Sequence, residues 1–323
     1  MPSPRSSPKP AAELDHDWSF DALGTRWVIS TPSELPESVV AGVSAELDRI
    51  DQAWSRFRGD SMVAEMSRRS GRFDVDLADQ PLLDWYRRLY DTTSGAVSPL
   101  VGQTLVDAGY DARYSLTPAA EVATVPAWDD VILSHRGGLT LAVPAVIDVG
   151  AAGKGFAVDR VAEIVASSCD EYIVDGGGDM RISAGQFSSD GSAGVRVALE
   201  HPLNPANAIG VVTVNGGAVC ASASNRRVWA DWHHIVDPRS GSPAREVLAT
   251  WVIVPDGPWA TMIADGLATA LFFTPATALR GRPALAGNAV EYPDFEHLDF
   301  EYVVVRRNGS VEHSSSARLE LFL

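Results

Sequence analysis

Cysteine is scarce in this chain. Only Cys169 and Cys220 occur among the 323 residues. Two cysteines cannot build a disulfide framework, and neither stands at a spacing typical of metal ligands. Both lie beside apolar segments, so we expect buried free thiols.

Long apolar runs are absent, and basic residues are outnumbered. The chain has 26 Lys and Arg against 42 Asp and Glu, a formal net charge of −16, which argues against nucleic acid or an anionic membrane as the main partner. No run reaches membrane-spanning length, and the Pro- and Ser-rich residues 1–16 lack the apolar core of a secretory signal. We therefore expect a disordered tail over 1–16, no membrane anchor and a cytoplasmic protein.

The remaining residues, 17–323, have no repeat or linker and read as one compact domain. The stretch 18–30 reads as strand, glycine turn and strand. Helices are expected after Pro36, over 80–93, after Lys154 and over 259–273, and short apolar runs between turns indicate strands, with a closing hairpin at Asn308-Gly309. The first helix should bury positions spaced by three and four residues: Val40, Val43, Leu47, Ile50, Trp54 and Phe57. This mixture predicts an α+β fold with a mainly antiparallel sheet core and packed helices.

One segment places a lone lysine inside a glycine-rich turn. Residues 147–165 read IDVGAAGKGFAVDRVAEIV, and a turn of this kind at a helix start suits an anion such as a phosphate. It is not a P-loop, because Gly150 and Gly153 are too close and Gly155, not Ser or Thr, follows Lys154. A structural turn with a surface lysine is the alternative.

A second glycine turn, DGGGDMRI at 175–182, follows a strong strand. It does not fit a dinucleotide fingerprint, because Arg181 stands where the third glycine belongs and a returning strand follows. The segment predicts either a tight turn flanked by Asp175 and Asp179, or a backbone surface for a flat ligand.

Histidines precede a loop in WHHIVDPRSGSP, residues 232–243. In an extended segment neighbouring side chains point to opposite faces, so only one of His233 and His234 can face a pocket. A histidine three residues before Asp237 suits acid–base chemistry, although an isolated histidine is more often structural.

The apolar helix over 259–273 carries a polar stripe. Thr261, Asp265 and Thr269 recur every four residues and so share one face. A buried carboxylate needs a partner, and hydroxyls one turn away supply oxygen ligands that suit Mg²⁺. Alternatively, Asp265 caps a loop or pairs with Arg226 or Arg227.

Taken in order along the chain, these segments resemble the ApbE family of FAD:protein FMN transferases. The similar stretches are LGT at 23–25, SRFRGDS at 55–61, a weaker SGAVSPLVG at 94–102, DVGAAGKGFAVD at 148–159, the GGGD turn, the loop around His234 and ADGLATALF at 264–272. Ala221 stands where the family has threonine, and Val97 and Ser98 replace Phe-Asp.

The resemblance implies roles for named residues. The FAD-contacting positions would be Leu23, Phe57, Ala96, Val97, Ser98, Asp148, Lys154 and Ile235. The Mg²⁺ ligands would be the carbonyl of Ala151 with Asp265 and Thr269; where some relatives add an acidic ligand, this chain has Met262, which leaves a second metal ion unsupported. His234 would be the catalytic base and Asp237 would orient it.

The activity implied is Mg²⁺-dependent transfer of FMN from FAD to a Ser or Thr hydroxyl of an acceptor protein, with release of AMP. Two alternatives stay open at this point. An FAD pyrophosphatase would use the same site with water as nucleophile and give free FMN and AMP. A non-catalytic FAD-binding protein would bind FAD without releasing AMP.

Overall fold

The computed structural model describes residues 14–184, 194–280, 298–316 and 318–322. Nearly all of the expected tail, 1–16, lies outside these ranges, and His16 is already the first residue of a strand. Among the helices in the described ranges, none is both long and apolar enough to cross a membrane.

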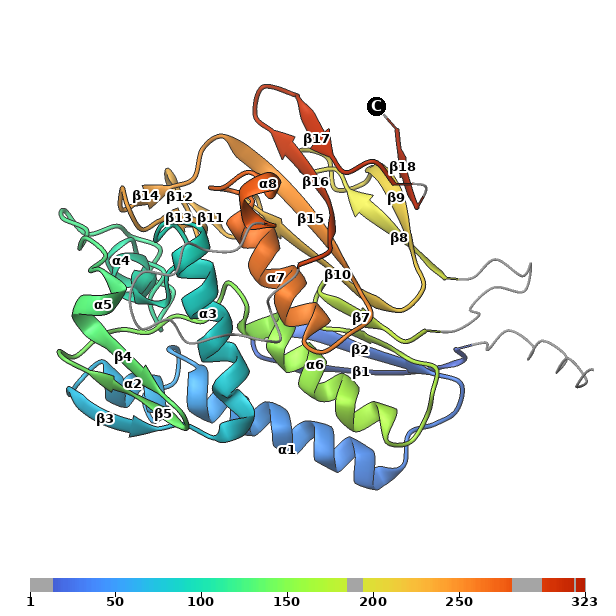
Figure 1. The fold of residues 1–323 in the computed structure, drawn as a ribbon, viewed down its shortest axis with the longest axis horizontal. Coiled ribbons are helices and arrows are strands. Elements are labelled where there is room, and N and C mark those ends of the chain that lie inside the picture. Colours follow the sequence, from blue (N-terminus) through green and yellow to red (C-terminus); the bar gives the residue numbers. More distant parts are fainter. Residues whose placement is uncertain (1–13, 185–193, 281–297, 317, 323) are drawn as a thin grey trace, which may run out of the picture.

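An eight-stranded sheet forms the centre of the fold (Figure 1), in the order β1-β2-β6-β7-β10-β15-β16-β17. Every neighbouring pair is antiparallel, as the sequence predicted. Its strands are β1 (His16–Ala22), β2 (Thr25–Thr31), β6 (Ile173–Asp175), β7 (Met180–Ile182), β10 (Gly217–Ala223), β15 (Val247–Pro255), β16 (Glu301–Arg306) and β17 (Val311–His313).

Smaller sheets flank it. One comprises β18 (Leu319–Leu321), β9 (Ala208–Val214) and β8 (Val195–Glu200), and another comprises β3 (Gly71–Asp74), β5 (Gly138–Leu141) and β4 (Ile132–His135). Two short hairpins pair β11 (Val228–Trp229) with β12 (Trp232–His233), and β13 (Val236–Asp237) with β14 (Ser242–Pro243).

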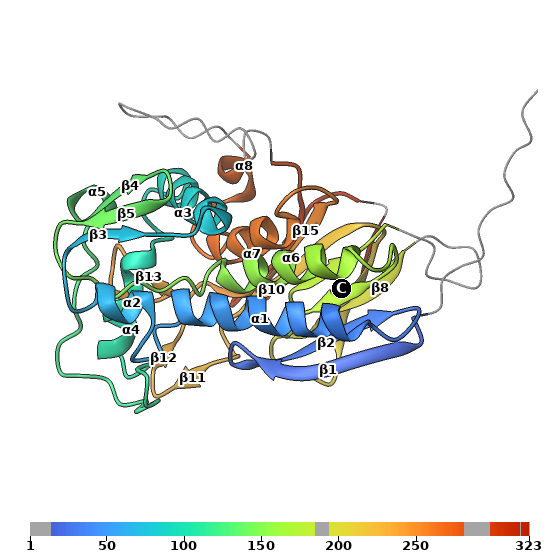
Figure 2. The same ribbon diagram turned by 90° about the horizontal axis from the view of Figure 1, so that it is seen from below.

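Long helices cover one face of the large sheet. Helices α6 (Gly153–Ala166) and α7 (Ala260–Ala270) pack on each other and on its strands, α1 (Glu37–Trp54) lies along α6, and α3 (Gln80–Thr92) packs on α7. Figure 2 shows α1 running above β1 and β2. The shorter helices are α2 (Met62–Met66), α4 (Gly102–Asp107), α5 (Trp128–Val131), α8 (Ala276–Leu279) and the 3₁₀ turns η1 (Leu77–Asp79) and η2 (Pro99–Val101).

Strand β15 shows why the core has two layers. Its side chains alternate between faces: Val252 and Val254 join the cluster under the helices, whereas Trp251 and Ile253 join a second cluster with residues of β8 and β9. Both faces of this strand are therefore buried, which explains its almost continuous apolar sequence.

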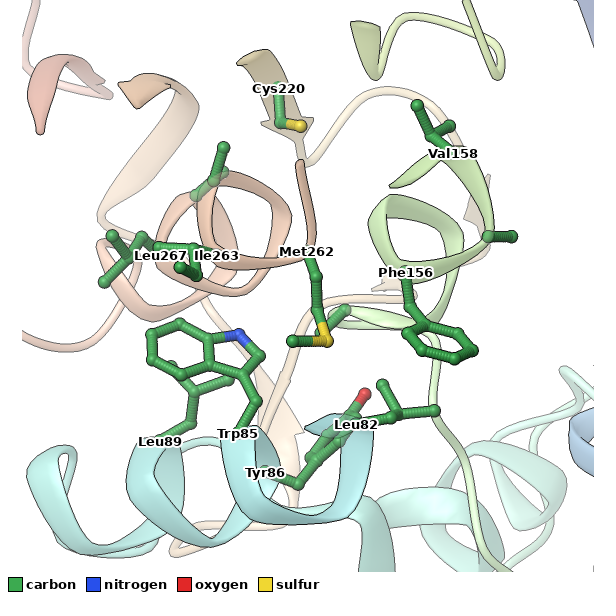
Figure 3. Close-up of a cluster of buried hydrophobic side chains, with 14 of the residues drawn as sticks. Leu82, Trp85, Tyr86, Leu89, Phe156, Val158, Cys220, Met262, Ile263 and Leu267 are labelled. Atoms are coloured by element: carbon green, nitrogen blue, oxygen red, sulfur yellow. The ribbon is translucent and has the colours of Figure 1, made fainter. Parts of the chain in front are cut away.

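The packing of α3 against α6 and α7 is apolar (Figure 3). Trp85, Tyr86 and Leu89 of α3 contact the region of Met262 and Leu267 on α7, within one buried cluster. Met262 is fully buried there. Met262, at the position that leaves a second metal ion unsupported, is thus part of the apolar core.

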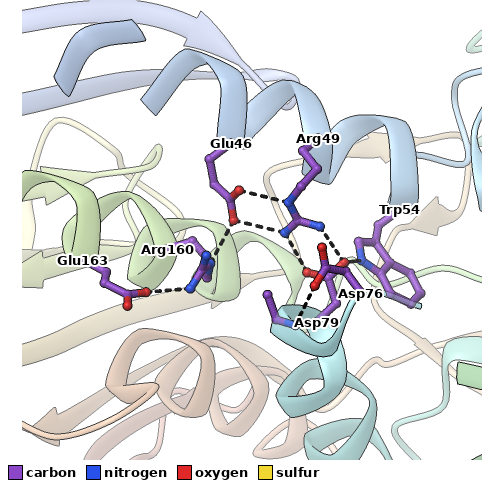
Figure 4. Close-up of polar contacts among 8 residues, drawn as sticks. Glu46, Arg49, Trp54, Asp76, Asp79, Arg160 and Glu163 are labelled. Carbon is purple, nitrogen blue, oxygen red and sulfur yellow. Dashed lines mark hydrogen bonds and ion pairs between the residues drawn. The ribbon is translucent and has the colours of Figure 1, made fainter. Parts of the chain in front are cut away.

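A polar network joins α1, α6 and η1 (Figure 4). The buried carboxylate of Asp79 accepts two hydrogen bonds from Arg49, at 2.7 and 3.0 Å, and one of 2.8 Å from the indole of Trp54. Glu46 bridges Arg49 to Arg160 of α6. These charge-assisted bonds fix the end of α1 from which the chain continues into the site described below.

The predicted helices and the hairpin at Asn308-Gly309 are present, with two corrections on α1. Phe57 is not on this helix, because the chain turns extended at Ser55 and the helix ends at Trp54. The sequence predicted Val40 as the first buried position of this helix, whereas Val39 is buried and Val40 is only partly buried. Of the thiols, Cys220 is buried and Cys169 is partly exposed.

Candidate active site

A cavity of about 1380 Å³ opens beside the first turn of α6 and the later turns of α7, at Asp265 and Thr269. Of the residues that the family resemblance placed in a site, all except Asp237 line it: Leu23, Phe57, Ala96, Val97, Ser98, Asp148, Ala151, Lys154, His234, Ile235, Asp265 and Thr269. Segments more than 200 residues apart in the chain therefore meet at one place. Thr261, the first residue of the predicted polar stripe, is buried and does not line the cavity.

Two glycine turns form one wall of the cavity. In the β1–β2 turn, Leu23 and Gly24 have φ 48° and 73°. A two-residue β-hairpin of type I′ needs a positive φ at both of its central residues. The turn between β6 and β7 packs against it so closely that a Cβ on Gly177 would lie 2.1 Å from the hydroxyl oxygen of Thr25. The predicted tight turn before a returning strand is therefore correct, and its backbone faces the cavity.

The lysine turn is held by two ion pairs. Arg56 donates to the carboxylate of Asp148 at 2.5 Å, and Lys154 pairs with Asp179, which is fully buried behind it. Burial raises the pKa of Asp148, but Arg56 outweighs it and the pKa lies below its usual value. Burial lowers the pKa of Lys154, and the carboxylates of Asp179 and Asp265 reverse this, so the lysine is a cation.

Asp265 and Asp159 cap each other's helices. Asp265 of α7 accepts from the N–H of Gly155 in the first turn of α6, at 2.9 Å. Asp159 of α6 accepts from the N–H groups of Thr261 and Met262 in the first turn of α7, at 3.1 and 2.9 Å. Each carboxylate satisfies N–H groups that a helix start leaves free.

The surroundings of Asp265 fit a cation. Burial, and next the neighbouring Asp179, raise the pKa of Asp265 well above its usual value, and one oxygen of Asp179 has no hydrogen-bond partner. The hydroxyl of Thr269 lies one turn along α7 and 3.4 Å from that of Ser222. Neither Arg226 nor Arg227 forms an ion pair with Asp265: Arg226 pairs with Glu200, and Arg227 lies over a tyrosine ring.

The donor set also limits which cation fits. Within the described ranges, no group of three or more His, Cys, Asp or Glu side chains comes together. A metal ion here would be held by one carboxylate, Asp265, with the neutral oxygens of Thr269 and Ala151. Mg²⁺ is commonly bound in this way, by one or two carboxylates and the phosphates of its substrate.

The neighbouring residues His233 and His234 lie in different environments. Both ring nitrogens of His233 are engaged, one 2.7 Å from the carbonyl of Ala244 and the other accepting from the N–H of Ile235 at 3.2 Å. His234 lines the cavity, and its Nδ1 has no partner. Burial, with the nearby Arg227 next, lowers its pKa from 6.5 to about 3, so its imidazole is neutral at pH 7.

Asp237 lies outside the cavity lining. Its carboxylate accepts from the side chain of Arg239 at 2.7 and 2.9 Å, and from the N–H of the same residue at 2.9 Å. This pairing, in a loop that closes on itself, occupies the carboxylate that was expected to orient His234.

Phe57 belongs to an aromatic group at one end of the cavity. Its ring stacks on Tyr114, with centroids 5.4 Å apart and planes at 4°, and contacts Tyr110 edge-on. The guanidinium of Arg56 lies 4.2 Å from the centre of the Phe57 ring.

Ser98 also lines the cavity. Its hydroxyl accepts a hydrogen bond from the N–H of Leu100 and caps the 3₁₀ turn η2.

Sequence reasoning gave no role in the site to Arg56, Asp179 or Tyr86, although it named Asp179 as a residue that flanks the glycine turn. Arg56 is buried beside Asp148 and has one nitrogen, Nη2, without a partner. Asp179 holds Lys154, and the hydroxyl of Tyr86 accepts from the N–H of Ala151 at 3.0 Å. Arg56 lies in the SRFRGDS stretch and Asp179 in the GGGD turn, but only the folded chain brings them to their partners.

A single α+β domain carries a cavity with a cation, a buried carboxylate and a neutral histidine on its walls, and this arrangement is typical of proteins that bind a small anionic ligand. The chain belongs to the ApbE family, whose sequence pattern matches residues 23–283. This confirms the family resemblance.

Curated relatives in this comparison share one name. A protein of Haemophilus influenzae, 27% identical over 87% of this chain and 80% of its own length, is named FAD:protein FMN transferase. So is one of Klebsiella pneumoniae, 26% identical over 68% of this chain and 71% of its own length. Both relatives are named as transferases, and this confirms the enzyme class that the sequence predicted.

Solved structures share the fold. The ApbE protein of Thermotoga maritima superposes with a TM-score of 0.74 at 23% identity, over 93% of this chain and 97% of that one. The flavin transferase ApbE of Vibrio cholerae gives 0.70 at 20% identity, over 94% and 97%. The expected fold class is confirmed.

Proposed function

We propose that this protein transfers FMN from FAD to a Ser or Thr hydroxyl of an acceptor protein and releases AMP, with Mg²⁺ as cofactor. The observation that carries the proposal is the meeting of Lys154, Asp265 and His234 on the walls of one cavity. These side chains supply a fixed cation, a metal ligand and a neutral base, which are the groups that transfer from a pyrophosphate requires. The names of the relatives support the coarser part of the proposal, the transfer of FMN from FAD to a protein.

In the reaction, the acceptor hydroxyl oxygen forms a bond to the phosphorus of the FMN half of FAD. The bond from that phosphorus to the AMP oxygen breaks, and AMP leaves with its electron pair. His234 accepts the hydroxyl proton, since its imidazole is neutral at pH 7 and Nδ1 is without a partner. Lys154, held in place by Asp179, offsets negative charge on the phosphates.

Asp265, Thr269 and the carbonyl of Ala151 would hold Mg²⁺. When bound, the ion neutralises the pyrophosphate and stabilises the charge on the departing AMP. Asp265 is suited to the task, because its raised pKa reflects a buried negative charge that the protein leaves only partly compensated.

The test is incubation of the protein with FAD, Mg²⁺ and a protein or peptide acceptor containing Ser or Thr. We expect AMP in solution and an acceptor whose mass increases by that of the FMN moiety. AMP with free FMN and an unmodified acceptor would indicate the pyrophosphatase. FAD binding without AMP would indicate a carrier.

A further inference from the structure

Large apolar side chains are exposed at the mouth of the cavity. Tyr114, Leu116 and Val228 line it while remaining 53%, 44% and 60% exposed. Exposed apolar groups that gather beside a binding site commonly mark a surface that a partner covers. We call these three residues the apolar rim.

The loop that carries Tyr114 and Leu116 is ordered by its own hydrogen bonds. Asp111 accepts from the N–H groups of Arg113 and Ser115, at 2.7 and 3.2 Å, and the N–H of Leu116 donates to the carbonyl of Gly109 at 2.8 Å. Tyr114 and Leu116 both have φ 51°, a left-handed conformation that costs free energy at non-glycine residues. The loop therefore holds two apolar side chains outward at an energetic cost.

The third rim residue is tied to this loop and to His234. Trp229, next to Val228, stacks on Tyr110 with centroids 5.6 Å apart and donates its indole N–H to the carbonyl of Ala108 at 2.7 Å. Val228 pairs with His233 across the hairpin of β11 and β12, and His234 follows directly. Val228 thus lies on the hairpin that leads directly into the proposed base, and Trp229 ties this hairpin to the loop that carries Tyr114 and Leu116.

The cavity is larger than most small-molecule pockets. Its volume of about 1380 Å³ exceeds the range of roughly 300–1,000 Å³ that small-molecule pockets usually occupy. In a transfer to a protein, the acceptor chain must enter beside FAD and bring its hydroxyl to His234. The rim shares the cavity lining with that histidine and is exposed to solvent, so a chain that enters the cavity there can contact it.

We propose that the apolar rim of Tyr114, Leu116 and Val228 docks the polypeptide segment of the acceptor, through apolar side chains that flank the modified Ser or Thr. The inference rests on the proposed transferase function and specifies its second substrate. Leu116 and Val228 contribute to acceptor recognition and not to FAD affinity. Tyr114 also stacks on Phe57, an implied FAD contact, and is therefore left unchanged in the test.

The experiment uses two synthetic peptides that differ only beside a single serine, one with leucine on both sides and the other with asparagine. The full-length protein is compared with Leu116→Ser, Val228→Ser and the double variant. The control variant is Leu133→Ser, which removes a leucine that is 69% exposed on β4, outside the cavity lining. Transfer is followed by peptide mass and AMP, and FAD affinity by flavin fluorescence without peptide.

We expect the unmodified protein to favour the leucine peptide by about tenfold in kcat/KM, since each tenfold corresponds to about 1.4 kcal/mol, a plausible gain for burying two partly exposed side chains. The double variant should lose this preference, with FAD affinity within about twofold of the parent. Leu133→Ser should behave like the parent.

Two results would overturn the inference. One is a preference for the leucine peptide that is absent in the parent or is kept in the double variant. The other is a loss of FAD affinity in the double variant as large as its loss of peptide transfer, which would assign the rim to the FAD site. If AMP is released and peptides are modified at equal rates throughout, only the rim is refuted. If the parent modifies no peptide, the transferase function fails and the rim proposal falls with it.

Discussion

The carboxylate of Asp265 accepts a hydrogen bond of 2.9 Å from the backbone N–H of Gly155, so the proposed metal ligand also closes the first turn of the neighbouring helix. A Cβ on Gly155 would lie 2.4 Å from the carbonyl oxygen of Thr261 and 2.8 Å from Cβ of Asp265. Helices α6 and α7 can approach this closely only because the residue after Lys154 has no side chain.

Replacing Gly155 should therefore separate the two helices. We expect Gly155→Ala to destabilise the protein by about 1–3 kcal/mol through overpacking and to weaken Mg²⁺-dependent activity, because Asp265 moves with α7. The matched control is Gly42→Ala in α1, where the nearest atom would be 3.5 Å away and better helix propensity predicts unchanged or slightly higher stability. Urea unfolding of both variants measures the difference; equal stability would contradict the close-approach argument.

The metal assignment predicts a specific defect for Asp265→Asn. The amide keeps an oxygen that can accept from Gly155, so the fold should remain, but the negative charge is lost and Mg²⁺-dependent cleavage of FAD should be abolished. Circular dichroism tests whether the fold remains, and AMP release tests whether FAD is still cleaved. Cleavage at the parental rate would refute the metal site.

Lys154 should act on the phosphates and also on stability. Lys154→Ala should weaken binding of FAD more than that of riboflavin, which has no phosphate, and should destabilise by roughly 1–3 kcal/mol because Asp179 loses its partner. Adding Asp179→Asn should restore part of the stability but not the affinity for FAD. Equal losses for FAD and riboflavin would mean that Lys154 only supports the turn.

The two histidines should separate chemistry from structure. His234→Ala should bind FAD and Mg²⁺ like the parent but transfer FMN about 10²–10⁴-fold more slowly. His233→Ala loses two hydrogen bonds and should cost about 1–3 kcal/mol of stability with kcat little changed. An inactive His233→Ala beside an active His234→Ala would reverse the assignment.

The lowered pKa of His234 fixes the sign of the pH dependence. A general base works when deprotonated, and its rate contribution is lost as the pH falls through its pKa. Burial and Arg227 lower the pKa of His234 from 6.5 to about 3. We therefore expect that kcat/KM, measured at saturating Mg²⁺, does not fall as the pH is lowered through 6.5. An acidic limb near pH 6.5 that disappears in His234→Ala would contradict the assigned environment.

Local patterns in the sequence were sufficient for the helices and for the polar stripe on α7, because side-chain periodicity and turn residues act within a few positions. The end of α1 was misjudged: Phe57 continues the apolar spacing, but the chain leaves the helix at Ser55 and places this ring among Tyr110 and Tyr114. Periodicity alone cannot tell a helix from a loop that continues its spacing by chance.

The partners of the site residues could not be predicted in the same way. Arg56 and Asp148 are 92 residues apart, and Gly155 and Asp265 are 110 apart, so their pairing depends on how the layers pack. Sequence reasoning offered Arg226 or Arg227 as the counter-ion of Asp265, whereas a helix start supplies the hydrogen bond. The expected link from Asp237 to His234 is replaced by a local pair with Arg239.

The central claim is transfer of FMN to an acceptor, and the most direct measurement is the molar ratio of modified acceptor to AMP. The protein is incubated with FAD, Mg²⁺ and excess acceptor, and both products are quantified by mass spectrometry over time, with His234→Ala and Asp265→Asn as controls. We predict one FMN-modified acceptor for each AMP and far slower formation of both products in the two variants. AMP matched by free FMN, with the acceptor unmodified, would contradict the account.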